Sequence, residues 1–92
     1  MAAADTLGLL EEARQIAKDL GYEVREEVLG DLPGGRCTIG DRAIVLLNLE
    51  HPPAERLDRL LAAIATEPRL ATEPKSRLLE ARLRDLERGS TR

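Results

Sequence analysis

The segment 34–49 (GGRCTIGDRAIVLLNL) constrains the fold most, because it reads as a β-hairpin whose second arm is strongly apolar. Gly40-Asp41 lies between two β-prone runs, and glycine at the first central position is typical of a two-residue type II′ turn. The turn also fixes the register of the two arms. The predicted pairs are Ile39–Arg42, Thr38–Ala43, Cys37–Ile44 and Arg36–Val45.

The second arm of this hairpin is apolar on both of its faces, since side chains alternate between faces along a strand. A sheet covered on one side only would alternate apolar with polar residues. We therefore expect the strand 43–49 to be central, with helices or a second subunit on its outer face. Cys37 falls beside Ile44 in an apolar layer, which predicts a buried and unreactive thiol. The two predicted faces are Cys37, Ile39, Ile44 and Leu46 on one side, and Ala43, Val45, Leu47 and Leu49 on the other.

Three helices and one further strand are predicted around the hairpin. The segment 22–29 alternates apolar with charged residues and reads as a half-buried edge strand, although Glu26 interrupts its apolar row. The element order α-β-β-β-α-α indicates one α+β domain over residues 1–92, built on a three-stranded antiparallel meander. Residues 89–92 are expected to form a frayed tail. Apolar residues at spacings of three and four place the helices between Asp5 and Gly21, from Pro53 to Ile64, and from Glu73 to Arg88.

The composition excludes several kinds of chemistry. The chain has one cysteine and one histidine, whereas a structural zinc site takes four such ligands. Cys37 and His51 would lie roughly 23 Å apart along an extended strand, which is too far for a nucleophile and its base. We therefore expect no metal, no cofactor and no cysteine–histidine dyad.

No membrane or secretion signal is expected. The longest strongly apolar run, 43–47, is far shorter than the roughly 20 residues of a membrane-spanning helix. Residues 1–5 have neither a basic region nor an apolar run of the kind that directs secretion. A single cysteine fits a reducing compartment. These features predict a soluble cytoplasmic protein.

The last third of the chain is basic, but its charge is mixed. Residues 66–92 contain seven basic and five acidic side chains, within a chain whose net charge is −3. A nucleic-acid surface would be more uniformly basic and would often carry aromatic stacking partners, which this segment lacks. Nucleic-acid binding is not expected, and a nucleic-acid-associated regulator acting through the basic C-terminal helix stays as an alternative.

Four polar residues gather at the junction between the apolar strand and the next helix. They make a second alternative, a small enzyme that uses the Asn48–His51 junction and neighbouring carboxylates. An anion site there is disfavoured, because Pro52 and Pro53 remove two N–H donors and the acidic residues add negative charge. A capped junction is the favoured interpretation. The four residues are Asn48, Glu50, His51 and Glu55.

The last helix carries a narrow apolar stripe. Leu79, Leu83 and Leu86 are spaced four and then three residues apart, as in a heptad, and Leu78 lies on the flank. A narrow stripe suits a helix–helix seam better than a broad contact with a sheet. We therefore favour a homodimer over docking of this helix on its own chain. The function predicted is protein–protein interaction or self-association without catalysis.

A resemblance covers about residues 20–65, from the run Leu20-Gly21-Tyr22-Glu23-Val24-Arg25 through the strand that ends at Asn48 to the helix after it. The hairpin begins Gly34-Gly35-Arg36-Cys37 and the following helix begins Pro53-Ala54-Glu55. In these features the chain resembles a group of small uncharacterised bacterial proteins with a Gly-Gly-x-Cys hairpin start and a Pro-x-Glu helix start, and the resemblance implies no activity. The element order is also loosely similar to the first half of bacterial regulator-cleaving zinc peptidases. Their helix carries His-Glu-x-x-His, whereas residues 57–64 here carry no metal ligand, so peptidase activity is not implied.

Overall fold

The computed structural model describes residues 2–90, and the side chains of residues 5–88. Within that range the fold is α+β, with three α-helices and three strands in the predicted order. A short 3₁₀ helix, η1, lies between the last two α-helices and adds one element to that order. The elements are α1 (Ala2–Asp19), β1 (Tyr22–Glu27), β2 (Gly35–Ile39), β3 (Arg42–Asn48), α2 (Pro53–Ile64), η1 (Pro68–Thr72) and α3 (Arg77–Ser90).

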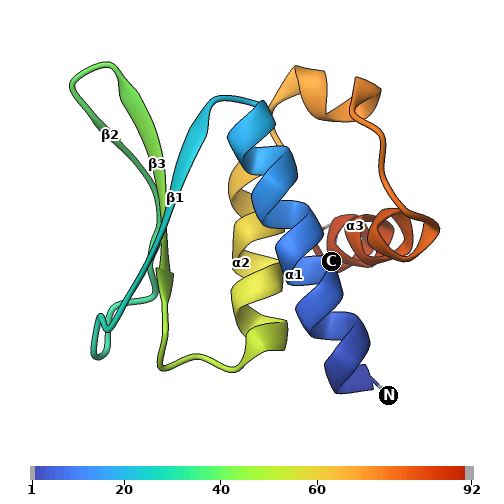
Figure 1. The fold of residues 1–92 in the computed structure, drawn as a ribbon, viewed down its shortest axis with the longest axis horizontal. Helices are drawn as coiled ribbons and strands as arrows, with labels where there is room; N and C mark the ends of the chain where they lie inside the picture. The colour runs from blue at the N-terminus through green and yellow to red at the C-terminus, as the bar shows by residue number, and fades with distance from the viewer. Residues whose placement is uncertain (1, 91–92) are drawn as a thin grey trace.

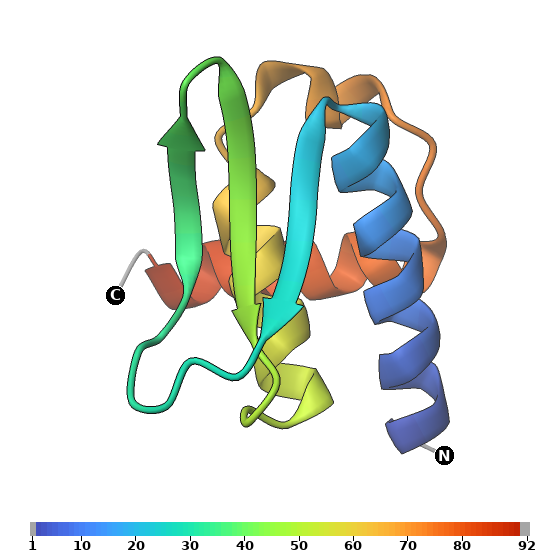
Figure 2. The ribbon, with the colours of Figure 1, turned by 60° about the vertical axis from the view of Figure 1, so that its left-hand side comes forward.

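The elements form three layers (Figure 1). The sheet is the first layer, α1 and α2 pack side by side against one of its faces, and α3 lies on the far side of these two helices. Figure 2 shows α3 crossing behind α1 and α2 at a steep angle. The other face of the sheet is covered by no element of the described chain. The predicted frayed tail is helical as far as Ser90, and Thr91 and Arg92 lie outside the described residues.

The hairpin has the predicted register. Cys37 pairs with Ile44 and Ile39 pairs with Arg42, on either side of the two-residue turn. Gly40 has a φ of 61°, and no residue other than glycine has a positive φ among those described. Asp41 therefore lies outside the left-handed region, which excludes a type I′ turn and agrees with type II′.

The predicted antiparallel meander is wrong. The strand order is β1-β3-β2, and β1 runs parallel to β3, with Tyr22 beside Ala43 and Glu27 beside Asn48. In a meander the third strand would lie at an edge of the sheet, and the N–H and C=O groups along one of its sides would be unpaired. The order found here gives β3 a neighbour on both sides, as expected for a strand that is apolar on both faces.

The connector 28–34 makes this order possible by crossing the end of β3. At Gly34, whose φ is 82°, the chain turns back so that β2 runs antiparallel to β3. A Cβ at this position would collide with the backbone oxygen of Leu46. Only glycine fits both the conformation and the close approach of the two backbones.

The core lies between the sheet and the two helices that cover it. Val45 and Leu47 of β3 face inward, and four apolar side chains of α2 are fully buried. Tyr22 pairs with Ala43 of β3, and its ring approaches Arg36 of β2, whose guanidinium carbon lies 5.6 Å from the ring centroid. The buried α2 residues are Leu57, Leu60, Leu61 and Ile64.

The outer face of the sheet is half apolar and half charged. Ile44 is buried between its strand neighbours, whereas Cys37 is only partly buried, because no element of the described chain covers this face. The predicted burial of the thiol is therefore wrong. On the β1 side, Glu23 accepts hydrogen bonds from Arg25 and Arg42 at 2.7 and 3.1 Å. The hydrogen bond from Arg25 holds the pKa of the Glu23 carboxyl below its ordinary value.

Candidate functional site

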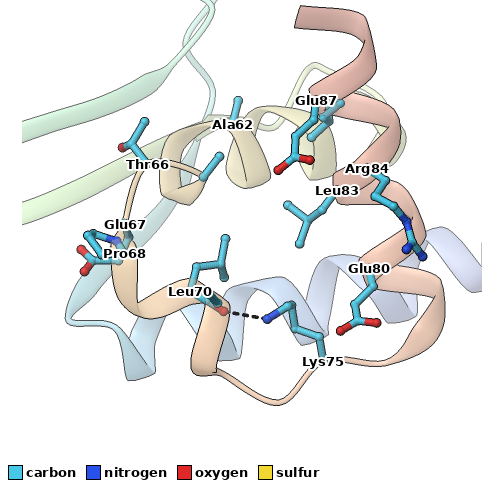
Figure 3. Close-up of a pocket in the computed structure, with 13 residues that line it drawn as sticks. Ala62, Thr66, Glu67, Pro68, Leu70, Lys75, Glu80, Leu83, Arg84 and Glu87 are labelled. Carbon is cyan, nitrogen blue, oxygen red and sulfur yellow. Dashed lines mark hydrogen bonds between the residues drawn. The ribbon is translucent and has the colours of Figure 1, made fainter. Parts of the chain in front are cut away.

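A groove of about 740 Å³ opens between the C-terminal end of α2, η1 and α3. Figure 3 shows Leu70 and Leu83 pointing into it from opposite walls, with Glu80, Arg84 and Glu87 along the α3 side. The floor is therefore apolar and the rim is charged. The groove is lined by Ala62, Ala65, Thr66, Glu67, Pro68, Leu70, Ala71, Lys75, Glu80, Leu83, Arg84, Leu86 and Glu87.

One wall of the groove is η1, whose start is set by Glu67 and Pro68. The Glu67 carboxylate accepts hydrogen bonds from the backbone N–H of Arg69 at 3.5 Å and from its Nε at 3.1 Å. The side-chain hydrogen bond from Arg69 lowers the pKa of Glu67. The guanidinium of Arg69 also donates to the backbone oxygen of Leu20 at the end of α1. These bonds fix η1 against the helical layer and bury Leu70.

The segment between η1 and α3 is tied down at both ends. The Nζ of Lys75 donates to the backbone oxygens of Leu70 at 2.6 Å and Glu73 at 2.8 Å, which satisfies carbonyls at the end of η1. The Ser76 hydroxyl accepts from the N–H of Leu79 at 3.1 Å and so caps α3. The Glu12 carboxylate accepts from the backbone N–H and the hydroxyl of Ser76 at 2.7 and 2.8 Å. The predicted start of the last helix at Glu73 is thus four residues early.

The other wall is α3, which an ion pair orients against α2. Arg82 donates to both carboxylate oxygens of Asp58, at 2.8 and 3.2 Å. The hydrogen bond to Asp58 raises the pKa of Arg82. This contact lies on the opposite flank of α3 from Glu80 and Arg84, so the helix turns that charged flank toward the groove.

The four leucines predicted for interaction have different places. Leu79 is 1% exposed and fills the core of its own chain. Leu83 and Leu86 are partly buried against that core and line the groove. Leu78 is 57% exposed and does not line the groove. The homodimer predicted from this stripe stays a prediction.

At the polar junction, Asn48 is completely buried and fully hydrogen-bonded. Its Oδ1 accepts from the N–H groups of Leu29 at 3.2 Å and Glu50 at 3.0 Å. Its Nδ2 donates to the backbone oxygens of Gly30 at 2.9 Å and Leu32 at 3.0 Å. All four hydrogen-bonding positions of the amide are occupied, so Asn48 pins the connector where it crosses the end of β3.

The rest of the junction is only partly brought together. His51 Nδ1 lies 3.6 Å from the Glu55 carboxylate, which also accepts from Arg59 at 3.2 Å. The backbone oxygen of His51 accepts from Arg56 Nε at 3.2 Å. Glu50 has an exposed side chain. Asn48 and His51 therefore share no side-chain contact that would join them in one reaction centre.

Sequence reasoning missed a charged cluster on the inner face of the sheet. Glu26 shares that face with Tyr22 and Val24, and its carboxylate accepts from Arg14 of α1 and from Arg56 of α2, the latter at 3.1 Å. The interruption of the apolar row by Glu26 was the available signal, because an acid facing inward requires a cation opposite it.

The described residues contain no group of three or more His, Cys, Asp or Glu side chains placed to hold a metal ion. None of the helices over this range is long and apolar enough to cross a membrane. No protein-family model, curated protein or solved structure matches the chain.

Proposed function

We propose that this chain is a non-catalytic protein-binding module, which receives the apolar side chains of a partner helix in the groove between α2, η1 and α3. The observation that carries the proposal is the apolar floor of that groove. Leu70, Leu83 and Leu86 line it together with the short side chains of Ala62 and Ala71. The small residues leave room for larger apolar side chains from outside.

The polar groups of the groove suit binding better than chemistry. Sites for small molecules and catalysis place a few polar groups so that they converge on one point. Here the ammonium group of Lys75 is engaged by two backbone oxygens, and Glu80 and Arg84 lie on the charged rim. A rim of both signs sets the register of a docked helix without requiring a highly charged partner.

A helix is the favoured occupant because the groove is bounded by helices. Partners that add a strand need an unpaired strand edge, whereas an amphipathic helix needs an apolar groove for residues at positions i, i+3, i+4 and i+7. The same surface accepts a helix of a second copy of this chain, which is the homodimer predicted from the sequence.

A single, partly exposed thiol suits a reducing compartment, and we place the module in the bacterial cytoplasm.

A photocrosslinking side chain at Ala62 tests the proposal. Ala62 is exposed, lines the groove and lies on α2, so p-benzoylphenylalanine there would face a docked partner. The matched control is Ala81, which is exposed on α3 outside the groove. We expect crosslinks from Ala62 to map by mass spectrometry to one amphipathic helical segment. Absence of such crosslinks, or the same crosslinks from Ala81, would refute the groove as the binding surface.

The crosslinked segment, made as a peptide, then provides the affinity measurement. Ala62→Arg and Ala71→Arg fill the groove without removing a core contact, and each is expected to weaken peptide binding at least about tenfold, or 1.4 kcal/mol. Ala81→Arg should leave the affinity unchanged. Circular dichroism of all three variants checks that the fold is kept.

A further inference from the structure

The strand β2 forms an open edge of the sheet. Figure 2 shows it beside β3 on one side, with no strand of the described chain on the other. The opposite edge, β1, carries charges at Glu23, Arg25 and Glu27, which discourage pairing with another chain. β2 has a single charged residue, Arg36, and neither a bulge nor a proline.

The hairpin geometry determines which backbone groups are available at this edge. The residues that flank a two-residue turn exchange hydrogen bonds, so Ile39, Cys37 and Gly35 direct their N–H and C=O groups toward β3. The alternate residues, Arg36 and Thr38, direct theirs away from the sheet. The edge therefore offers two donors and two acceptors in an ordinary antiparallel spacing.

We propose that β2 pairs with β2 of a second copy of this chain, antiparallel and about a two-fold axis at Cys37, so that two sheets join into one of six strands. Arg36 of each copy then exchanges hydrogen bonds with Thr38 of the other. Cys37 lies opposite Cys37 of the second copy, and Gly35 lies opposite its Ile39. This register pairs the whole of β2, Gly35–Ile39, with itself.

The side chains of β2 fit this register on both faces. On the outer face, Ile39 is 59% exposed and comes to lie over Gly35 of the other copy, where there is no side chain and where no atom lies within 4 Å of the place a Cβ would take. It there approaches Leu46, the partner of Gly35 on β3. On the inner face, each Arg36 lies opposite a threonine, so no like charges meet.

The neighbouring registers fit less well. An axis at Arg36 would place two guanidinium groups directly opposite each other, which is destabilising. An axis at Thr38 would draw Gly40 of the turn into the ladder and leave Gly35 unpaired. The fit between the side chains of two β2 strands therefore favours the axis at Cys37. It also favours a second copy of this chain as the partner.

Cys37 supplies a direct test of the register. Residues opposite each other at a non-hydrogen-bonded antiparallel position have Cα atoms about 4.5 Å apart, within the range that a disulfide spans. Diamide takes two electrons and two protons from the paired thiols, and should convert the concentrated native protein rapidly into a disulfide-linked dimer. In the control Cys37→Ser/Ile39→Cys, the two thiols would be roughly 13 Å apart, four residues along the strand, and should link far more slowly.

Thr38→Pro tests the pairing without a crosslink. Proline is tolerated on an edge strand where the N–H faces outward, so the variant should keep the circular dichroism of the native protein. It removes the N–H that the second copy requires, and sedimentation should show a monomer where the native protein and Thr38→Val are dimeric. A native protein that is monomeric at high micromolar concentration would overturn the proposal. So would a dimer that Thr38→Pro leaves intact, or equal linking rates for residues 37 and 39; if Thr38→Pro does not fold, the linking rates decide. A dimer formed through the groove would persist in Thr38→Pro, so this variant distinguishes the two surfaces.

Discussion

Replacing Asn48 by aspartate is expected to cost about 3–5 kcal/mol of folding free energy at neutral pH. The carboxylate keeps the acceptor that Leu29 and Glu50 use, but it loses the donor that bonds Gly30 and Leu32. Two hydrogen bonds contribute about 1 kcal/mol each, and a buried charge facing two carbonyl oxygens adds further cost. The loss is a large share of the roughly 5–14 kcal/mol expected for a domain of this length.

The pH dependence of this loss has a definite sign. The carbonyl oxygens of Gly30 and Leu32 disfavour the charged form, so the pKa of the new carboxyl in the folded state lies above its unfolded value of about 3.9. A protonated carboxyl can donate one hydrogen bond, and the deficit relative to the native protein is smallest below the unfolded pKa. It grows as the pH rises through the folded pKa and is constant above it.

Urea denaturation of the Asn48→Asp variant and the native protein, from about pH 8 to about pH 4, measures this difference. The matched control is Gln15→Glu, another amide-to-acid change, on the exposed face of α1. There a like-charge contact with Asp19 should cost only about 0.5 kcal/mol. Equal stability of Asn48→Asp and the native protein at neutral pH, or a deficit that grows on acidification, would contradict the role of Asn48 as the pin of the connector.

Three further changes test other contacts. Gly34→Ala should lower the thermal midpoint strongly, because its Cβ collides with backbone, whereas Gly8→Ala in an open position of α1 should raise stability by up to about 1 kcal/mol. Glu26→Leu leaves two arginines without their acid and should cost about 2–4 kcal/mol in urea denaturation, and the exposed Glu27→Leu should cost little; equal effects would argue against the cluster. Asp58→Asn should speed amide hydrogen exchange in α3 more than in α2, and unchanged exchange would show that the ion pair does not hold α3 in place.

The hairpin could be predicted because its determinants are local. Gly40-Asp41 specifies the turn, the turn specifies the register, and both require only neighbouring residues. Strand order depends on distant contacts. A meander and a central third strand were both expected, yet they exclude each other, because a three-stranded meander places its third strand at an edge. The apolar pattern of β3 was the better guide. The connector 28–34 was the missed signal, since it is long enough to cross about 10 Å, or two strand spacings.

The groove could be predicted only in part. The stripe of Leu79, Leu83 and Leu86 is a property of the helix alone, but its division between core and groove depends on how α3 is oriented. That orientation comes from residues far away in the chain, through the contacts of Arg82 with Asp58 and of Ser76 with Glu12. No periodicity in the sequence reports such pairs.

Tyr22 is the chain's one aromatic side chain, and this has a spectroscopic consequence. Without tryptophan the protein absorbs weakly in the near ultraviolet, yet every near-ultraviolet dichroic signal comes from one ring. That ring lies where α1 passes into β1 and reaches Arg36 on the far strand. Because the ring is buried in the core that the sheet shares with the helices, its signal follows contact between these layers, while the far-ultraviolet signal follows the helices themselves. Both signals can be measured without adding a label. If the near-ultraviolet and far-ultraviolet unfolding curves coincide, the layers separate in one step.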